Sequence, residues 1–597
     1  MSIAQNFPNI KPSLMLSFAD TKQLDSRITY TRASTASYYD GVTTSKAEEN
    51  LFTYSQEFDN AAWLKTNATV TANSTAAPDG TTTADTLFET TTNGQHRVFV
   101  SPTVTGTYTI SAYAKAAGRD YVALWFGGVD KGKFFYIPAG GSGSVGNNFV
   151  NAPDSSSITY VGNDWYRCTV TVSGLSGSAQ HINACLDATT FSYAGDVTKG
   201  VHIWGAQLEQ RSAVTAYTAT TTQAITNYIP KLQSAASGVA RFDNNPTTGE
   251  SLGLLIEESR TNLQLNSELL TSNWSATRTN ISSTTIVAPN GALTGSKLYT
   301  DSTASNTHFL TQSGYFITAT GTITFSVYAK AAELSKIGLR EGANTGSYAT
   351  FNLTTGAVIS SAGTGVVAAI TSVGNGWYRV AMTLTNTGNS TFEIYLLPNS
   401  YTSGGPTVSF NGDGWSGLYI WGAQSENGAF ATSYIPTVAS QVTRAADAAS
   451  MTGTNFSSWY RQGESTIYAD FVLNGQDSGH GAGIVSLFYN SSSNGLLLFR
   501  NTANSTFLAY VDSTSASIGT ITVGSSYKTA FAYNGSSNGA VLNAGTVSSV
   551  GTSLSQQPIQ MNIFADSSGG QKPTGTIKKI AYYPLRVTNA QLQALTS

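Results

Sequence analysis

The feature that most constrains this chain is a long internal repeat. The stretch Asp164-Trp-Tyr-Arg-Cys-Thr-Val-Thr-Val172 returns as Gly376-Trp-Tyr-Arg-Val-Ala-Met-Thr-Leu384. Further segments recur in the same order and at nearly the same spacing: Asn50-Leu51 and Asn262-Leu263, Ala77-Pro-Asp-Gly80 and Ala288-Pro-Asn-Gly291, Tyr113-Ala-Lys-Ala-Ala117 and Tyr328-Ala-Lys-Ala-Ala332, and Ile203-Trp-Gly-Ala-Gln207 and Ile420-Trp-Gly-Ala-Gln424. Solenoid and propeller repeats have units of about 20–50 residues, and this repeat is far longer. We therefore predict that each copy is a whole domain.

Length and composition narrow the class of protein. A chain of 597 residues exceeds what one hydrophobic core supports, so about three to five domains are expected. Charged residues make up 11% and the net charge is −3, which argues against a nucleic-acid-binding protein with a basic face. A hydrophobic fraction of 40% argues against disorder. We find neither a signal-peptide pattern nor an apolar run long enough to span a membrane, so we expect folding in the cytosol.

Alternating apolar and polar residues predict antiparallel strands in both copies. In the second copy Ile323 and Phe325 share one face of a strand, and Tyr328 and Lys330 share the other. Strands of this length, joined by turns rich in glycine and asparagine, predict an all-β chain of several antiparallel β-sandwiches or jelly rolls. The one helix we expect lies at the C-terminus, where Thr588 would cap it.

The repeat and the changes of pattern divide the chain into five predicted segments. They are an N-terminal segment of strands (1–45), a first jelly roll (46–230), a bridging segment (231–261), a second jelly roll (262–437) and a last, different sandwich (438–597). Because each copy of the repeat carries its own alternating strands, each is expected to enclose its own core.

Several of these segments resemble parts of bacteriophage virion proteins. The opening of the first copy, Asn50-Leu-Phe-Thr-Tyr-Ser-Gln-Glu-Phe-Asp-Asn-Ala-Ala-Trp63 with the later Ala77-Pro-Asp-Gly80, resembles the carbohydrate-binding-module-like jelly rolls of such proteins. Residues 12–40 and 241–262 resemble the framing segments of the same family. The last segment, which ends in Gly575-Thr-Ile-Lys-Lys-Ile-Ala-Tyr-Tyr-Pro584, is similar to concanavalin A-like, laminin G-type sandwiches. The resemblance implies two jelly rolls and a terminal laminin G-like sandwich.

The resemblance also implies a function and partners. It implies a virion structural protein, folded in the host cytoplasm, that serves as a fibre or receptor-binding component and attaches to host cell-surface polysaccharide. Residues 1–45 would dock it to other virion proteins, and by resemblance to fibres it would be a homotrimer. One alternative is a head fibre that decorates the capsid without a specific receptor, and another is a polysaccharide depolymerase.

The depolymerase alternative is disfavoured by the sequence. Clustered carboxylates and the short-strand repeats of a β-helix spike are both missing from the pattern, so we expect that the protein is not an enzyme and assign no catalytic residue. We expect no cofactor. Residues 450–597 lack an obvious calcium motif of the laminin G kind, so the sequence does not decide whether this segment binds structural calcium.

The non-core faces of the repeated strands supply the candidate carbohydrate-binding residues. They are Tyr113, Lys115, Trp165 and Arg167 in the first copy, joined there by Trp125, and Tyr328, Lys330, Trp377 and Arg379 in the second. Aromatic planes suit the C–H faces of sugars, and planar or charged donors suit their hydroxyls. In the alternative interpretation the tryptophans pack at a sheet edge and the Lys and Arg stems cover apolar surface. We interpret Trp204 and Trp421 as packing residues.

The histidines and the paired carboxylates of this sequence indicate neither a metal site nor a catalytic pair. His96 and His308 recur between the copies, but without a tight cluster we interpret them as polar loop residues rather than metal ligands. Glu257 and Glu258 are adjacent in a strand-like run. Adjacent strand residues face opposite ways, so these two side chains cannot flank one glycosidic bond.

The cysteine content is too low for a disulfide framework. Cys168 occupies the position of Val380 in the second copy, which indicates a small buried hydrophobic residue. Whether Cys168 pairs with Cys185 stays open from sequence, and two free thiols are the favoured interpretation.

Overall fold

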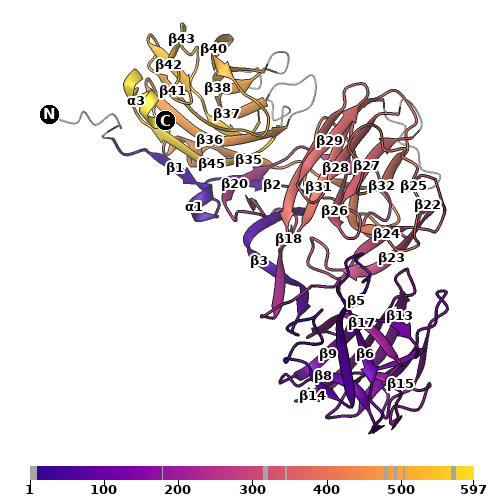
Figure 1. Ribbon diagram of the computed structural model, residues 1–597. Helices are drawn as coiled ribbons and strands as arrows, with labels where there is room; N and C mark the ends of the chain where they lie inside the picture. The colour runs from indigo at the N-terminus through magenta and orange to yellow at the C-terminus, as the bar shows by residue number, and fades with distance from the viewer. Residues whose placement is uncertain are drawn as a thin grey trace, which may run out of the picture.

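The computed structural model describes residues 8, 10–177, 179–312, 320–342, 346–475, 482–489, 494–501, 505–565 and 573–597. Three antiparallel β-sandwiches make up the molecule, and helices contribute little (Figure 1). The predicted fold class, all-β with several antiparallel sandwiches, is confirmed. None of the helices in the described part of the chain has the length and apolarity needed to cross a membrane.

The first jelly roll packs two antiparallel sheets against each other. One sheet has the order β4 (Leu64–Thr66), β8 (His96–Val100), β15 (Gln180–Cys185), β10 (Tyr121–Phe126), β11 (Lys131–Tyr136) and β12 (Ser144–Asn148). The other has the order β5 (Ala68–Thr75), β6 (Ala84–Glu89), β17 (Gly200–Glu209), β9 (Thr105–Ala117), β14 (Tyr166–Ser176) and β13 (Ser155–Tyr160), and β7 (Asn93–Gly94) pairs with β16 (Tyr193–Ala194). Ile110, Phe126, Val170 and Leu208 are fully buried between the sheets, as the alternation on β9 requires.

The second jelly roll repeats both strand orders. One sheet runs β22 (Trp274–Thr277), β25 (His308–Gln312), β32 (Phe392–Leu397), β27 (Lys336–Glu341), β28 (Tyr348–Asn352) and β29 (Ala357–Ala362). The other runs β23 (Thr279–Ile286), β24 (Gly295–Thr300), β33 (Gly417–Asn427), β26 (Gly321–Ala331), β31 (Trp377–Asn386) and β30 (Val367–Gly374). The sequence repeat is therefore a repeat of one fold, strand for strand.

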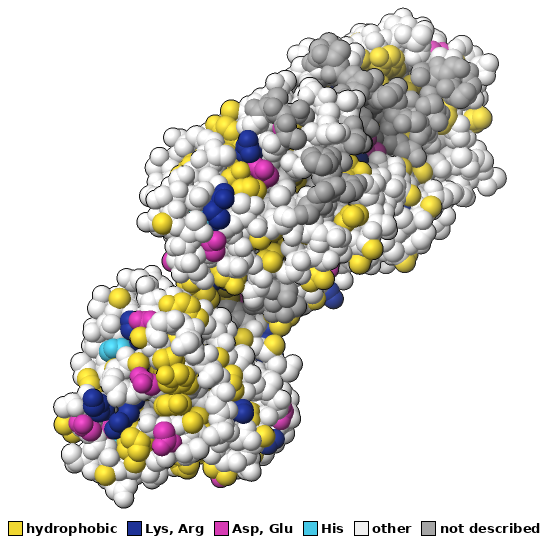
Figure 2. Space-filling view, turned by 90° about the vertical axis from the view of Figure 1, so that its right-hand side faces the viewer, with side chains coloured by type: hydrophobic (Ala, Val, Ile, Leu, Met, Phe, Trp, Pro, Cys, Tyr) yellow, Lys and Arg dark blue, Asp and Glu magenta, His cyan; other side chains and the backbone are white. Residues whose placement is uncertain are grey.

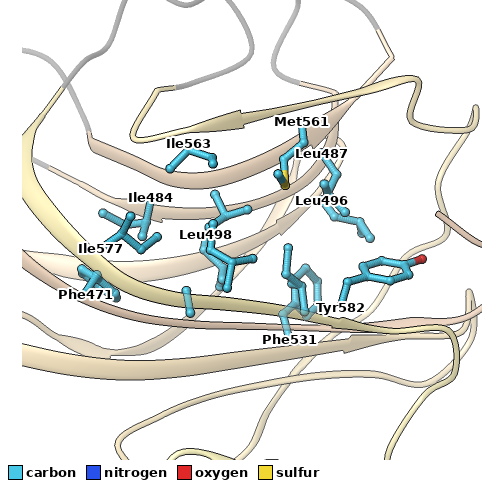
Figure 3. Packing of buried hydrophobic residues seen from close by; sticks show 14 of the residues in the cluster. Phe471, Ile484, Leu487, Leu496, Leu498, Phe531, Met561, Ile563, Ile577 and Tyr582 are labelled. Carbon is cyan, nitrogen blue, oxygen red and sulfur yellow. The ribbon is translucent and has the colours of Figure 1, made fainter. Parts of the chain in front are cut away.

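The third sandwich contains the largest core cluster (Figure 3). One sheet has the order β19 (Arg241–Asn244), β20 (Ser251–Ile256), β45 (Thr574–Tyr583), β36 (Ser465–Gly475), β41 (Ser526–Tyr533), β42 (Asn538–Leu542) and β43 (Ser548–Val550), with β1 (Leu14–Ser17) also on β45. The facing sheet has the order β2 (Thr29–Thr31), β35 (Ala448–Thr452), β44 (Gln560–Ile563), β37 (Ala482–Phe488), β38 (Gly495–Arg500), β39 (Thr506–Val511) and β40 (Thr514–Thr520). Phe471 and Ile577 from one sheet meet Leu498 and Ile563 from the other.

The third sandwich is assembled from three separate parts of the chain, which corrects the predicted segment bounds. Leu14 of β1 lies opposite Tyr582, Tyr30 of β2 opposite Ala449, and Leu255 of β20 opposite Thr576. Residues 1–45 and 231–261 are thus not separate units, and 438–597 is too short for the whole sandwich. Pairing between distant strands leaves no mark in the order of the sequence, so the pattern could not reveal it.

A two-stranded ribbon connects the third sandwich to the jelly rolls. It pairs β3 (Ala36–Asn50) with β18 (Ile225–Ala235), and lies between the bodies in Figure 1. The predicted boundaries at 45/46 and 230/231 fall inside these strands. The ribbon packs on the second jelly roll, where Tyr39, Ala47, Ile229 and Leu232 join its buried residues.

Three short helices complete the described structure. They are α1 (Phe18–Thr21), α2 (Thr454–Ser457) and α3 (Asn589–Leu595). The predicted cap of α3 is confirmed: the Thr588 hydroxyl accepts from the Gln591 N–H, and the Gln591 side chain accepts from the Thr588 N–H. Leu592 on the buried face of this helix packs with Ala530 and Val541 of the adjacent sheet.

A buried ionic cluster joins the framing segments to the end of the second jelly roll. Asp447 lies 3.1 Å from an Arg32 nitrogen and 2.5 Å from an Arg241 nitrogen. Glu257 lies 2.6 Å from Arg241 and 2.9 Å from Arg444, whose strand β34 (Val442–Arg444) pairs with β21 (Arg260–Asn262). Burial alone would raise the pKa of Glu257, but the guanidiniums of Arg444 and Arg241 lower it to about 2. Glu257 is therefore an ionised structural residue.

The carboxyl group of Asp243, which lies beside this cluster, should make the stability of the protein depend on pH. Burial raises the pKa of Asp243 to about 6 from its usual 3.8, while Asp243 accepts a hydrogen bond from the Tyr39 N–H. The folded state therefore binds this proton more tightly than the unfolded state, and its contribution to stability is lost as pH rises through about 6. Asp243→Asn keeps an oxygen that accepts the hydrogen bond from the Tyr39 N–H but has no charge to bury. Its melting temperature should therefore exceed that of the wild type at pH 8, and the difference should disappear at pH 4, where Asp243 of the wild type is protonated. Equal differences in melting temperature at both pH values would contradict the raised pKa.

Candidate functional site

A cleft lies between the two jelly rolls, beside the ribbon. Its volume of about 810 Å³ falls within the range of about 300–1,000 Å³ typical of small-ligand sites. The first jelly roll, the ribbon and the second jelly roll all contribute to it: Asp79, Tyr113, Asn163, Arg167, Trp204 and Tyr217; Glu48 and Asn227; and Lys330, Glu333, Asp413, Trp415 and Tyr419. In Figure 2, as in Figure 1, the first jelly roll is the lower body, and charged side chains are scattered over the face shown.

The floor of the cleft is a triangle of aromatic rings on the first jelly roll. The Tyr113 and Trp204 ring centroids are 5.1 Å apart, and Tyr217 lies 4.7 Å from Trp204 and 5.9 Å from Tyr113. The Arg167 guanidinium lies 5.3 Å from the Tyr113 ring centroid and donates to the Thr215 carbonyl and the Ser111 hydroxyl. These contacts hold the rings and the cation in one rigid platform.

The second jelly roll contains the same platform, but the chain itself covers it. Tyr328, Trp421 and Tyr434 lie 5.4, 4.7 and 5.9 Å from one another, and Arg379 lies 5.4 Å from the Tyr328 ring centroid. The ribbon packs on these residues through the side chains Tyr39, Ala47, Ile229 and Leu232. On the first jelly roll the equivalent surface borders the cleft instead. The two copies thus differ in what lies over an identical set of rings.

The opposite wall of the cleft comes from the second jelly roll. Trp415 packs toward Tyr113 and Trp204 of the first roll, and its ring covers the Lys297 ammonium, which lies 3.1 Å from the ring centroid. Lys297 pairs with Glu333 at 2.9 Å. Burial raises the pKa of Tyr113, the Arg167 guanidinium opposes this effect, and the Glu333 carboxylate adds to it.

Further charged groups at the margin are held by their neighbours. Lys330 lies 2.7 Å from Glu48 of the ribbon, and Glu48 also accepts from the Asn375 amide at 2.8 Å. Burial alone would raise the pKa of Glu48, but Lys330 and the Asn375 hydrogen bond hold it below its usual value. Asp413 accepts from the backbone N–H groups of Trp415 and Ser416, which orients the loop that carries Trp415.

The predicted sheet-face tryptophans are buried, which corrects the binding interpretation for them. Trp165 is 1% exposed and Trp377 0% exposed. Their indole N–H groups donate to the Ala76 and Val287 carbonyls at 3.0 and 3.1 Å. Neither ring is open to a ligand, so the packing alternative describes both.

Four of the other predicted residues lie in or beside the cleft. Tyr113 and Arg167 form the floor of the cleft and Lys330 its margin, while Lys115 donates to the Asn163 carbonyl at the edge. The structure does not bring Tyr328 and Arg379 to the cleft, because the ribbon buries their platform.

Trp125 lies on the other sheet of the first jelly roll, away from the cleft. It is 5% exposed and stacks between Phe149 at 4.4 Å and His181 at 4.1 Å. Loop residues such as Phe149 and Phe191 cover it, so it belongs to a small core of its own.

Sequence reasoning missed several residues of the cleft. The packing interpretation of Trp204 agrees with its burial, but Trp204 also lines the cleft. The sequence pattern does not point to Tyr217, Glu333 or Trp415. A tryptophan in the turn Gly412-Asp-Gly-Trp415, outside any alternating strand, was the available signal for a surface aromatic.

The two repeated histidines are buried strand residues, not loop residues as predicted. His96 and His308 begin β8 and β25, are both 0% exposed, and contact the Asn67 and Arg278 carbonyls through Nδ1. Among the described residues, no group of three or more His, Cys, Asp or Glu side chains is placed to hold a metal ion.

The two cysteines are free and do not pair. Cys168 on β14 lies in the main core of the first jelly roll, and Cys185 on β15 lies in the small core around Trp125. They belong to different sheets, which explains why they stay apart. Burial raises the pKa of both thiols.

No family model and no curated protein matches the chain. Among solved structures, it is similar to the N-terminal CBM22-1–CBM22-2 tandem domain of Xyn10C from Paenibacillus barcinonensis, with 14% identity and a TM-score of 0.18 over 63% of this chain and 98% of that one. It is also similar to a sialidase from Trypanosoma rangeli, with 9% identity and a TM-score of 0.21 over 90% of this chain and 98% of that one. A third similar structure is mouse laminin alpha1 domains LG4-5, with 10% identity and a TM-score of 0.16 over 47% of this chain and 86% of that one. Similarities with TM-scores this low do not indicate a function for this chain.

One prediction from the sequence is corrected by these comparisons. We expected that the protein is not an enzyme, but the structures that it matches include a sialidase, which is an enzyme. The expectation is therefore withdrawn. With 9–10% identity and a TM-score of 0.21, the match does not assign catalysis to this chain either.

Proposed function

We propose that the protein binds a glycan in the cleft between its jelly rolls. The observation that carries the proposal is the pair of identical aromatic platforms: the ribbon seals one, and the other borders an 810 Å³ cleft. Half-buried aromatic rings from both jelly rolls, Tyr217 and Trp415, line the cleft and suit the C–H faces of sugar rings. The carboxylates and amides around them suit sugar hydroxyls, which both donate and accept hydrogen bonds.

We propose further that this binding attaches a phage virion to host cell-surface polysaccharide. The support is the resemblance of Asn50–Trp63 and the framing segments to phage virion proteins. In this proposal the protein is a fibre component, docked to other virion proteins and trimeric, so that several weak sites act together. Antibody labelling of virions, viewed by electron microscopy, tests the location.

Replacing Trp415 by alanine tests the cleft. We expect the variant to lose about 1–3 kcal/mol of glycan affinity, by analogy with bases stacked on aromatic side chains. The measurement is binding to a printed oligosaccharide array, followed by titration calorimetry with the strongest ligand. Tyr510→Ala, on β39 of the third sandwich, is the matched control and should bind as the wild type does. A Trp415→Ala variant that binds with unchanged affinity would contradict the proposed site.

A further inference from the structure

We propose that the cleft selects uncharged glycans and rejects those that carry carboxylate or sulfate groups. This inference rests on the proposed function, since it concerns the ligand of the same cleft. It follows from the charges that line the cleft and from the contacts that already hold each of them.

Negative side chains outnumber positive ones around the cleft. The lining contains four carboxylates, Glu48, Asp79, Glu333 and Asp413, against two cations, Arg167 and Lys330, and Lys297 under the Trp415 ring adds a third cation, which leaves an excess of one negative charge. The excess of negative charge makes the cleft unfavourable for an anion, because like charges within several ångströms repel each other. The protein wall screens this repulsion less than bulk water does.

All three cations are already engaged. Lys330 is held 2.7 Å from Glu48. Arg167 donates to the Thr215 carbonyl at 2.8 Å and to the Ser111 hydroxyl at 3.1 Å, with its guanidinium against the Tyr113 ring. The nearby Lys297 lies under the Trp415 ring and pairs with Glu333. The two terminal nitrogens of Arg167 each donate one hydrogen bond within the protein, so a carboxylate would have to compete with these contacts to bind this arginine bidentately.

Two of the four carboxylates, Asp79 and Glu333, remain partly exposed to a neutral ligand. Asp79 is exposed, and its Oδ1 accepts from the Thr81 N–H and hydroxyl. Neither Asp79 nor Asp413 forms an ion pair with any residue in the described ranges, and the Glu333 side chain keeps 25% exposure. Ionised carboxylates only accept hydrogen bonds, so their natural partners here are the hydroxyl donors of an uncharged sugar.

The test uses paired oligosaccharides that differ only in charge. Hexose oligomers and the corresponding hexuronic acid oligomers are printed on one array and probed with the full-length protein. We expect the best-bound members to be neutral, and each matched acid to bind at least about tenfold more weakly at low salt. The gap should narrow at about 1 M salt, where the screening length falls to about 3 Å. Combining Asp79→Asn with Glu333→Gln should also narrow it.

The possible outcomes separate the two proposals. Acidic oligomers that bind as tightly as their neutral counterparts, with binding still dependent on Trp415, would overturn the charge selection and leave the glycan site standing. Binding to neither class, or binding that survives Trp415→Ala, would overturn the proposed function itself. A preference for neutral over acidic oligomers that is lost in the Asp79→Asn, Glu333→Gln variant supports both the glycan site and its charge selection.

Discussion

Replacement of Trp377 by alanine is expected to destabilise the second jelly roll by about 3–5 kcal/mol, the usual cost of emptying a large buried aromatic site. The side chain is fully buried and packs with Trp421, Tyr328 and the ribbon residue Ile229. Its N–H bonds to the Val287 carbonyl, which would lose its partner. Glycan binding should be unaffected in the protein that remains folded, because Trp377 is not part of the cleft lining.

Denaturant unfolding and glycan binding, measured on the same variant, check this expectation. Trp415→Ala is the contrasting variant, since its ring is only partly buried and lines the cleft. We expect a large loss of stability with intact affinity for Trp377→Ala, and the reverse pattern for Trp415→Ala. A Trp377→Ala protein of normal stability that no longer binds glycan would restore the sheet-face site that the sequence suggested.

Local patterns in the sequence predicted the two jelly rolls well. The recurrence of the Trp-Tyr-Arg strand reflects one strand order used twice, and the alternation around Ile323 and Phe325 placed these residues in the core. The pattern could not predict which strands complete the third sandwich. β1 and β45 pair across almost the entire chain, and hydrophobic periodicity reports the face of a residue but not its neighbour on the next strand.

The same limit explains what the sequence missed at the site. Alternation correctly placed Trp165, Trp377, Arg167 and Arg379 on the face away from the main core. Whether that face meets solvent depends on what packs on it, and the ribbon and the second jelly roll decide this. The decisive aromatic, Trp415, comes from a loop of the other copy, so neither copy read alone contains the site.

Removal of the Asp447 carboxylate is expected to destabilise the third sandwich by about 3–5 kcal/mol, because it leaves buried arginines without their counter-charge. Asp447 contacts both Arg32, which follows β2, and Arg241, which begins β19, and all three side chains are fully buried. It also accepts from the Glu257 N–H at 2.8 Å. Asp447→Ala therefore breaks the contacts that fasten two framing segments to the strand β35 that Asp447 precedes.

The measurement is hydrogen–deuterium exchange over β2, β19 and β35, together with calorimetric unfolding. Exchange in these strands should rise first, since their attachment depends on the cluster, while the cores of the two jelly rolls stay protected. Asp25→Ala is the matched control: it removes a partly exposed pair with Arg27 at 2.7 Å and should cost at most about 1 kcal/mol. If Asp447→Ala behaved like Asp25→Ala, the framing strands would owe their place to backbone pairing and apolar packing alone, and the ionic cluster would add nothing measurable to the assembly.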